Sequence, residues 1–247
     1  MEQEKTILCY GDSNTWGYVP GGNGARHPRD VRWPGRLQKL LGSGYYVIEE
    51  GLNSRTIVWD DPVKGDKSGL EYITPCLQSH KPLDLVIIML GSNDTKERFN
   101  LDGYDIARSM TRLLDAVIFS RAGIGGTAPK VLLISPPLIR EDVTPEVIVR
   151  EMGPKAPARA RELARYYRIV AKDYGIAFFD AAKVTKASAV DTIHMDEEGH
   201  RLLADAVAVE VRRLLSEDGA ESGQDASSSA MCGALKQDRT KNSLGEE

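Results

Sequence analysis

Continuous apolar runs, rather than alternating ones, place the strongest constraint on how this chain folds. A run that is apolar at every position predicts a strand covered on both faces, which is typical of parallel sheets. Four such runs and a shorter fifth occur, at Thr6–Tyr10, Leu85–Leu90, Val131–Ser135, Ile176–Phe179 and Tyr46–Ile48. We therefore expect a parallel sheet that is buried between two layers.

Helical patterns lie between these runs. Apolar residues recur there with the period of about 3.6 residues that marks an amphipathic helix. The expected helices are Trp33–Leu41, Asp105–Phe119, Arg159–Tyr174 and Glu197–Leu215. Strands that alternate with helices form right-handed βαβ units, so the pattern predicts an α/β fold with a doubly wound sheet.

Length and charge narrow the class of protein. The 247 residues suffice for one large domain, and 41% hydrophobic with 28% charged residues is the profile of a globular protein. The net charge of -4 is spread over interspersed acids and bases, which argues against a nucleic-acid-binding surface. No apolar span approaches the roughly 20 residues that cross a membrane. We therefore expect a cytoplasmic protein with no nucleic-acid or membrane partner.

The cysteines and the end of the sequence add little chemistry. Cys9, Cys76 and Cys232 are too few and too scattered for a disulfide framework or a zinc site. From about Ser216 the sequence is rich in serine, glycine and acids, and such a segment cannot offset its ordering entropy. We expect a domain over residues 1–216 and a disordered tail over 217–247; a tail that binds a partner is the alternative.

Polar clusters follow the expected strands. In open α/β sheets, ligands bind beyond the carboxyl ends of the strands. Because parallel strands end at the same edge, we expect these clusters to meet there. They are Gly11-Asp12-Ser13-Asn14, Gly51-Leu52-Asn53-Ser54-Arg55-Thr56, Gly91-Ser92-Asn93-Asp94 and, before the last helix, Asp191-Thr192-Ile193-His194.

These residue types support acyl transfer. A serine hydroxyl needs an adjacent base, and Ser13 with His194 provides that pair. Asp191 precedes His194 by three residues and could accept its Nδ1 proton, which fixes the tautomer. Asn93 could donate its side-chain amide to a developing oxyanion, together with backbone amides of Ser13 and of the Gly51–Arg55 loop.

His194 is also the best base by elimination. The chain has four histidines. We expect His27 and His80 in polar loops, where they adjoin proline or lysine. His200 falls in the last expected helix, as a surface or packing residue.

Each residue alone also has a structural explanation. Ser13 could cap a turn and Asn93 could be a turn residue. The segment Asp191–His194 could be a solvated loop or half of a metal site. Arg55 and Asp94 could form a salt bridge that shapes the loop. The combination favours catalysis, because every cluster falls at the same end of the sheet.

The four clusters together resemble the blocks of the SGNH, or GDSL, hydrolase superfamily, over roughly residues 5–215. Longer strings, among them "ILCYGDSNTWGYVP", "VIEEGLNSRT" and "LDLVIIMLGSNDTK", resemble its arylesterase and acyltransferase branch. That branch acts on small esters and can pass acyl groups to alcohols or peroxide. The resemblance thus implies a serine esterase, of the carboxylic-ester hydrolase and acyltransferase type.

The resemblance also implies a fold and a set of site residues. The fold is a flavodoxin-like, three-layer α/β/α sandwich with a five-stranded parallel sheet. Ser13, Asp191 and His194 match the catalytic triad of the superfamily, and Asn93 matches its side-chain oxyanion donor. The backbone donor in the second block is generally a glycine, and the best alignment places Ser54 there.

Further expectations concern the surroundings of the site. Trp16 and Tyr18 are candidate substrate-binding residues, and Ile57, Val58 and Trp59 are candidate walls of the entrance. Asn14 stands where many members have leucine, which we expect to alter packing rather than chemistry. The partner is a small-molecule ester, with no metal or organic cofactor. The resemblance suggests a homo-oligomer, with an octamer as one form.

Two other functions remain open. A carbohydrate O-deacetylase of the same superfamily would use the same residues beside a wide polar cleft. A non-catalytic small-ligand-binding module on a flavodoxin-like fold belongs to another class. A phosphate-binding module would need a glycine-rich loop, and "GDSNTWG" is too acidic for one.

Overall fold

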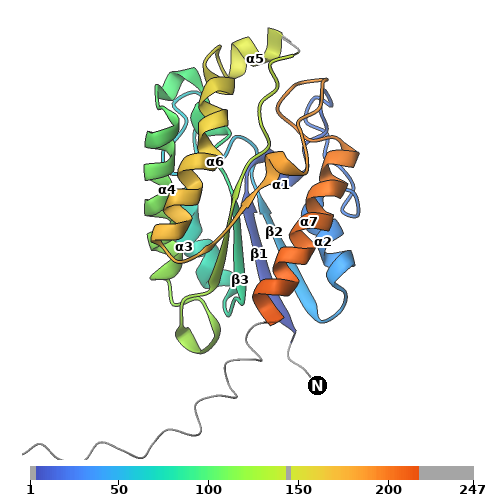
Figure 1. Ribbon diagram of the computed structural model, residues 1–247, viewed down its shortest axis with the longest axis vertical. Helices are drawn as coiled ribbons and strands as arrows, with labels where there is room; N and C mark the ends of the chain where they lie inside the picture. The colour runs from blue at the N-terminus through green and yellow to red at the C-terminus, as the bar shows by residue number, and fades with distance from the viewer. Residues whose placement is uncertain (1–3, 143–145, 217–247) are drawn as a thin grey trace, which may run out of the picture. The chain divides into compact units, whose positions relative to one another are not determined.

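A five-stranded, all-parallel sheet forms the centre of the domain, as the apolar runs predict (Figure 1). The computed structural model describes residues 4–142 and 146–216, and the expected tail over 217–247 lies outside them. The strand order is β2-β1-β3-β4-β5. The strands are β1 (Lys5–Gly11), β2 (Tyr45–Gly51), β3 (Leu85–Met89), β4 (Lys130–Ser135) and β5 (Ala177–Asp180).

Helices cover both faces of the sheet and complete three layers (Figure 1). Alternate residues of β3 serve the two sides: Val86 and Ile88 join one apolar core, and Leu85 and Ile87 join the other. The first core is closed by α3 (Gly69–His80), α4 (Gly103–Ile118) and α6 (Ala156–Asp173), and the second by α2 (Trp33–Leu41) and α7 (Glu197–Ser216). The flavodoxin-like α/β/α architecture is therefore confirmed.

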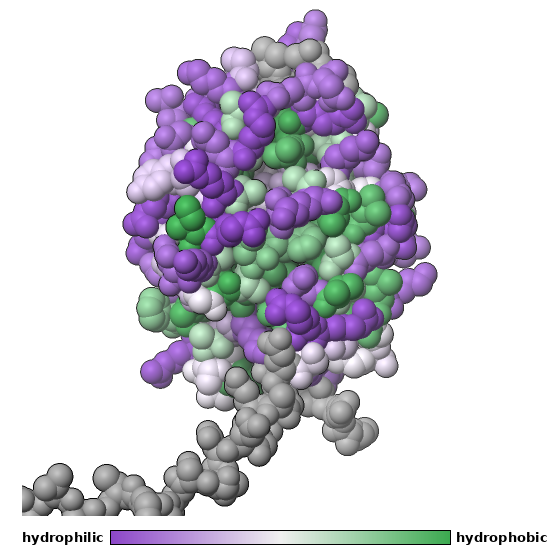
Figure 2. Space-filling model, viewed as in Figure 1, coloured by the Kyte–Doolittle hydropathy of each residue, from purple (hydrophilic) through white to green (hydrophobic). Residues whose placement is uncertain are grey.

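The two edge strands differ from the central ones. Every residue of β5 is only half-buried, although its apolar composition predicted burial on both faces. Among the described residues, strand β5 pairs only with β4, so no described strand lies along its outer side. Figure 2 shows the side of the molecule that faces the viewer in Figure 1. Apolar residues gather along the middle of that side, over the edge of the sheet between α6 and α7. The opposite edge strand, β2, is longer than expected because Glu49 and Glu50 extend it and bind Arg32 and His80.

One long helix, α3, was not expected from the sequence. Its Pro75 lacks a backbone N–H and weakens the helical pattern. The Ser68 hydroxyl accepts a hydrogen bond from Glu71 N–H and caps its first turn, and Ile73 and Leu77 bury one face. His80 is the last residue of α3 rather than part of a loop. Shorter elements are α1 (Ser13–Trp16), α5 (Glu146–Glu151), η1 (Asn93–Thr95), η2 (Glu97–Phe99), η3 (Ile124–Gly126) and η4 (Ala181–Lys183).

Two glycines end neighbouring strands where another segment approaches closely. A Cβ at Gly11 would lie 2.0 Å from Thr15 Oγ1, and one at Gly51 would lie 2.1 Å from Trp16 N. Only glycine therefore lets α1 fold back across the ends of β1 and β2. Within residues 4–142 and 146–216, every helix is too short or too polar to span a bilayer.

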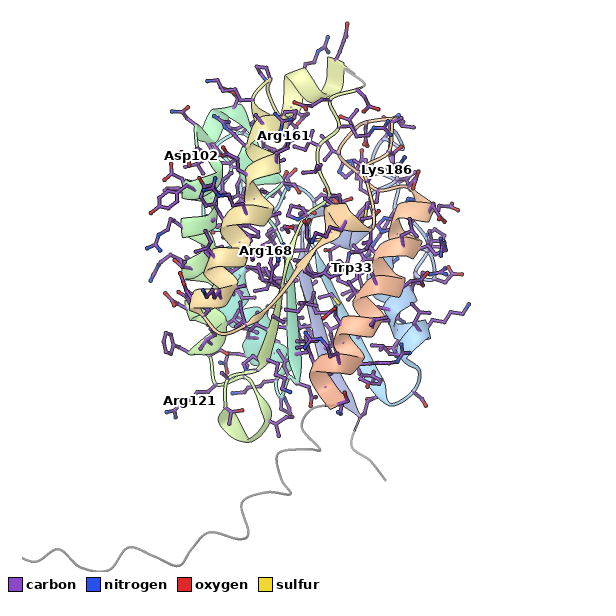
Figure 3. The ribbon with its side chains drawn as sticks, viewed as in Figure 1. Trp33, Asp102, Arg121, Arg161, Arg168 and Lys186 are labelled. Atoms are coloured by element: carbon purple, nitrogen blue, oxygen red, sulfur yellow. The ribbon has the colours of Figure 1, made fainter. Side chains whose placement is uncertain are left out.

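His200 is a buried packing residue, and the surface alternative is wrong. Its side chain in α7 is fully buried, and its Nδ1 accepts a hydrogen bond from Trp33 N–H at 3.3 Å. Trp33, labelled in Figure 3, lies between the sheet and α7. His27 is also buried, and its ring meets that of His200 edge-on at 5.2 Å. Burial, and next the nearby His27, lower the pKa of His200 to about 3.

The buried imidazole of His200 predicts a pH dependence of stability. The unfolded chain protonates this residue near its ordinary pKa of about 6.5, while the folded chain resists protonation until about pH 3. The free energy of unfolding therefore falls as pH decreases through this window, by about 2 kcal/mol between about pH 7 and about pH 5. A His200→Asn variant, whose side-chain oxygen can still accept from Trp33 N–H, should lose less free energy of unfolding over the same pH range. Denaturant titrations at both pH values measure the difference, and equal losses would contradict the prediction.

Candidate active site

Three side chains from two distant parts of the sequence form a continuous hydrogen-bonded line. His194 Nε2 lies 2.9 Å from Ser13 Oγ. His194 Nδ1 lies 2.7 Å from Asp191 Oδ2. Ser13 is 7% exposed, so little of this residue meets solvent. The arrangement matches a nucleophile, a base and a carboxylate that orients the base.

Ser13 owes its position to the end of β1 and the turn that follows. Strand β1 ends at Gly11, and Asp12 caps the short helix α1 by accepting a hydrogen bond from Asn14 N–H at 2.9 Å. Helix α1 ends at Gly17, which takes a left-handed backbone with φ 90°. Ser13 is the first residue of α1, and Figure 1 places this helix at the carboxyl end of the sheet. Asp12 therefore anchors the turn, and its burial raises its pKa.

Asp191 holds both the ring and the backbone of the histidine segment. Its Oδ1 accepts from Ile193 N–H at 3.1 Å and from His194 N–H at 3.0 Å, while Oδ2 faces the ring. Burial alone would raise the pKa of Asp191, but the hydrogen bonds from His194 outweigh it and the pKa is lowered. Asp191 is thus held as an ionised acceptor for the Nδ1 proton.

Aromatic rings surround the base and the following turn. The Tyr18 ring stacks on the His194 ring, with centroids 4.4 Å apart. Its hydroxyl accepts a hydrogen bond from Gly24 N–H at 3.0 Å, which holds the ring in place. Trp16 lies 6.3 Å from Tyr18 and has the Arg26 guanidinium over its own ring. Tyr18 therefore supports the base directly, a contact that the sequence did not indicate.

Three groups are suited to receive an oxyanion. Asn93 comes from η1, and one N–H of its side chain donates to the Arg55 carbonyl at 3.0 Å. An amide nitrogen carries two N–H groups, so the second remains for a ligand. Ser54 has φ 66°, a left-handed conformation that explains why glycine is usual at this position. Within the described chain, the backbone amides of Ser13 and Ser54 have no hydrogen-bond partner.

The expected salt bridge between Arg55 and Asp94 is replaced by other contacts. Arg55 donates to the backbone carbonyl of Gly11 at 3.0 Å, and its guanidinium lies over the Tyr10 ring. Asp94 accepts from Ile57 N–H at 3.0 Å. Burial raises the pKa of Asp94 to about 7. Each residue therefore links the end of a neighbouring strand to the loop after β2. The link is a hydrogen bond to a backbone group rather than an ion pair.

The expected walls of the entrance have different positions. Ile57 is fully buried in the core, so the expectation that it lines the entrance is wrong. Trp59 is 49% exposed and lines an apolar groove with Val58 and Leu70, bounded by α4 residues such as Asp105. None of the three triad residues lines that groove.

Asn14 takes part in more than packing. It is 3% exposed, and its side chain bonds to the backbone on both sides of His194. The expectation that it changes packing alone is therefore incomplete. The signal in the sequence was an amide directly after the nucleophile, where many members of the family have leucine.

One trio among the described residues has donor atoms close enough to hold a metal ion. The ligand atoms of Glu50, Cys76 and His80 lie within 4.8 Å of one another. Two features disfavour a cation there. Glu50 Oε1 and His80 Nε2 already lie 2.9 Å apart as a hydrogen-bonded pair. Burial raises the pKa of Cys76 to about 12, and the positive charge of Arg55, which acts on the thiol, would repel a metal.

Residues 9–202 match the GDSL-like lipase/acylhydrolase family. The chain belongs to this family. An aryl esterase from M. smegmatis is 44% identical, and its structure aligns with a TM-score of 0.80 over 85% of this chain and 99% of that one. A carbohydrate acetylesterase from Sinorhizobium meliloti is 37% identical, with a TM-score of 0.80 over 85% of this chain and 100% of its own. Family membership makes the chain a hydrolase that acts on ester bonds.

A more distant relative is an acetylxylan esterase from Xylanibacter ruminicola. It is 25% identical over an alignment of 224 positions, which covers 83% of this chain and 43% of the relative. The chain thus spans less than half the length of this curated relative.

Asn93→Ala should leave the fold and substrate binding intact but lower kcat about 10²–10³-fold. The free N–H of Asn93 would meet negative charge that develops only in the transition state, so its loss raises the barrier more than it weakens binding. Steady-state kinetics with an aryl acetate separate kcat from KM. A raised KM with unchanged kcat would make Asn93 a binding or turn residue instead.

Proposed function

We propose that this protein is a serine esterase that acts on small carboxylic esters of aryl or alkyl alcohols with short acyl groups. The reaction passes through an acyl-enzyme, whose acyl group goes to water and also to alcohols or peroxide. The observation that carries the proposal is the line from Ser13 Oγ through His194 to Asp191, with heavy-atom distances of 2.9 and 2.7 Å.

Acylation begins with attack of Ser13 Oγ on the ester carbonyl. His194 Nε2 accepts the hydroxyl proton, and the Nδ1–H bond to Asp191 stabilises the imidazolium. The carbonyl oxygen becomes an oxyanion that the amides of Ser13 and Ser54 and the side chain of Asn93 stabilise. His194 then gives its proton to the leaving alcohol as the carbon–oxygen bond breaks.

Deacylation repeats these steps with a second nucleophile. His194 takes a proton from water, an alcohol or a peroxide, and the nucleophile attacks the acyl carbon of the Ser13 ester. When the tetrahedral intermediate collapses, the same proton returns to Ser13 Oγ. None of these steps draws on a metal or an organic cofactor.

A carbohydrate O-deacetylase is the second candidate, because the 37% identical relative is a carbohydrate acetylesterase. The same catalytic groups would serve it. The higher identity to an aryl esterase, 44%, favours the small-ester substrate. Parallel assays with an aryl acetate and an acetylated xylan fragment compare the two by kcat/KM. A non-catalytic binding module is disfavoured, because binding alone requires no serine hydroxyl aligned on a histidine base.

The remaining parts of the proposal concern the protein's setting. We retain a homo-oligomer, with an octamer as one form, and a cytoplasmic location. Light scattering and cell fractionation measure them. Neither is needed for the chemistry of Ser13.

Ser13→Ala should abolish nearly all esterase activity while the protein stays folded. Removal of the nucleophile from a comparable triad lowers kcat by about 10⁶-fold. Ser109→Ala is a matched control, because that buried hydroxyl donates only to Ile106 in its own helix. Activity of the Ser13 variant above about a tenth of wild type would defeat the assignment, whereas loss in both variants would indicate unfolding.

Acyl transfer to alcohols gives a separate test. An apolar surround that restricts water near Ser13 would give an alcohol a binding advantage over water. Wild-type enzyme with a vinyl or aryl ester and rising concentrations of a short alcohol should yield the new ester as well as free acid. Chromatography measures both products together. If acid is the only product at every alcohol concentration, the transferase part of the proposal fails and the hydrolase part stands.

A further inference from the structure

We propose that Asn14 is a positioning residue, which locks the His194 segment onto the helix that carries the nucleophile. The proposal rests on the serine-esterase function above and deepens it. Asn14 follows Ser13 directly in α1, so it links the two reacting side chains through a few bonds.

The side chain of Asn14 spans His194 from one neighbour to the other. Its Nδ2 donates to the Ile193 carbonyl at 3.3 Å, and its Oδ1 accepts from Met195 N–H at 2.9 Å. A carbonyl requires a donor and an N–H requires an acceptor, so the two partners fix the orientation of the amide. A carboxylate or an apolar side chain of similar size would satisfy one partner or neither.

These two bonds complete the hydrogen bonding of the backbone around the base. Asp191 accepts from the N–H groups of Ile193 and His194. The His194 carbonyl accepts from Ser188 N–H at 2.7 Å. With Asn14 bound to the Ile193 carbonyl and Met195 N–H, each backbone polar group from Ile193 N–H to Met195 N–H has a partner. Without Asn14, a half-buried carbonyl before His194 and a buried N–H after it would lose their partners.

The two hydrogen bonds of Asn14 help to set the distance between His194 Nε2 and Ser13 Oγ. Asp191 fixes the tilt of the ring within its own segment, but it does not attach that segment to α1. Asn14 makes that attachment, since its backbone belongs to α1 and its side chain grips the segment. A displacement of about 1 Å between reacting groups can lower a rate about 10²-fold.

The test compares three substitutions at Asn14 with one control. Asn14→Leu removes both hydrogen bonds at similar volume, and Asn14→Ala removes them with a loss of volume. Asn14→Asp keeps an acceptor for Met195 but loses the donor to Ile193. Thr185→Val is the matched control, because it removes a buried hydrogen bond from Thr185 Oγ1 to the Gly199 carbonyl and leaves the hydrogen bonds of Ile193, His194 and Met195 in place.

The kinetic readout is the split between kcat and KM on an aryl acetate, below the melting temperature of each variant. Asn14→Leu and Asn14→Ala should lower kcat about 10²-fold with KM within about twofold of wild type. The kcat of Asn14→Asp should lie between those of wild type and Asn14→Leu, or below both. Thr185→Val should keep the wild-type kcat even if it melts at a lower temperature. A kcat for Asn14→Leu within about twofold of wild type would overturn the proposal. The same fall in kcat for Thr185→Val would also overturn the proposal, because the loss of any buried hydrogen bond would then be enough to lower kcat.

A spectroscopic readout separates this proposal from the function on which it rests. The ¹⁵N chemical shift of His194 Nε2, which accepts from Ser13 Oγ, reports the contact between the segment and α1 and needs no substrate. Replacement of Asn14 should move this shift toward its value in Ser13→Ala, while Thr185→Val keeps the wild-type value; an unchanged shift in Asn14→Leu overturns the proposal. If wild-type enzyme hydrolyses no ester, the proposed function fails, and the NMR comparison still decides whether Asn14 holds the ring.

Discussion

The parallel register of the central strands is the constraint on which the rest of the structure depends. Gly11 at the end of β1 lies level with Gly51 of β2 and with Met89 of β3. Three loops therefore leave the sheet at one height, and each begins with a polar block. The proposed approach of Ser13, Ser54 and Asn93 to one substrate atom depends on this coincidence of strand ends.

Backbone groups, more than ion pairs, hold the site together. Arg55 and Asn93 bond to carbonyl oxygens of neighbouring segments, and Asp94 and Asp191 accept from backbone N–H groups. Buried carboxylates without such donors would be costly, which is why burial raises the pKa of Asp94 to about 7 despite its bond to Ile57. Such hydrogen bonds to backbone groups would hold the proposed oxyanion donors in place, as electrostatic catalysis requires.

Much of this arrangement could be predicted from the sequence, and the failures have physical causes. Apolar runs predict strands because burial on both faces leaves a continuous pattern, and the four polar blocks predict the site because parallel strands end together. Helix α3 was missed because Pro75 interrupts a helix whose stability comes from packing rather than from propensity. The expected salt bridge between Arg55 and Asp94 was wrong because a position next to a proposed oxyanion donor does not determine which groups a side chain meets.

The sequence by itself determined the fold class, the family and the residue types of the site, since these depend on local pattern and chain order. Tertiary structure alone decided which partner each polar side chain takes. The stacking of Tyr18 on His194 and the grip of Asn14 on Ile193 and Met195 join residues far apart in the chain. Such contacts depend on angles and distances between packed elements, and one sequence carries no periodic signal for them.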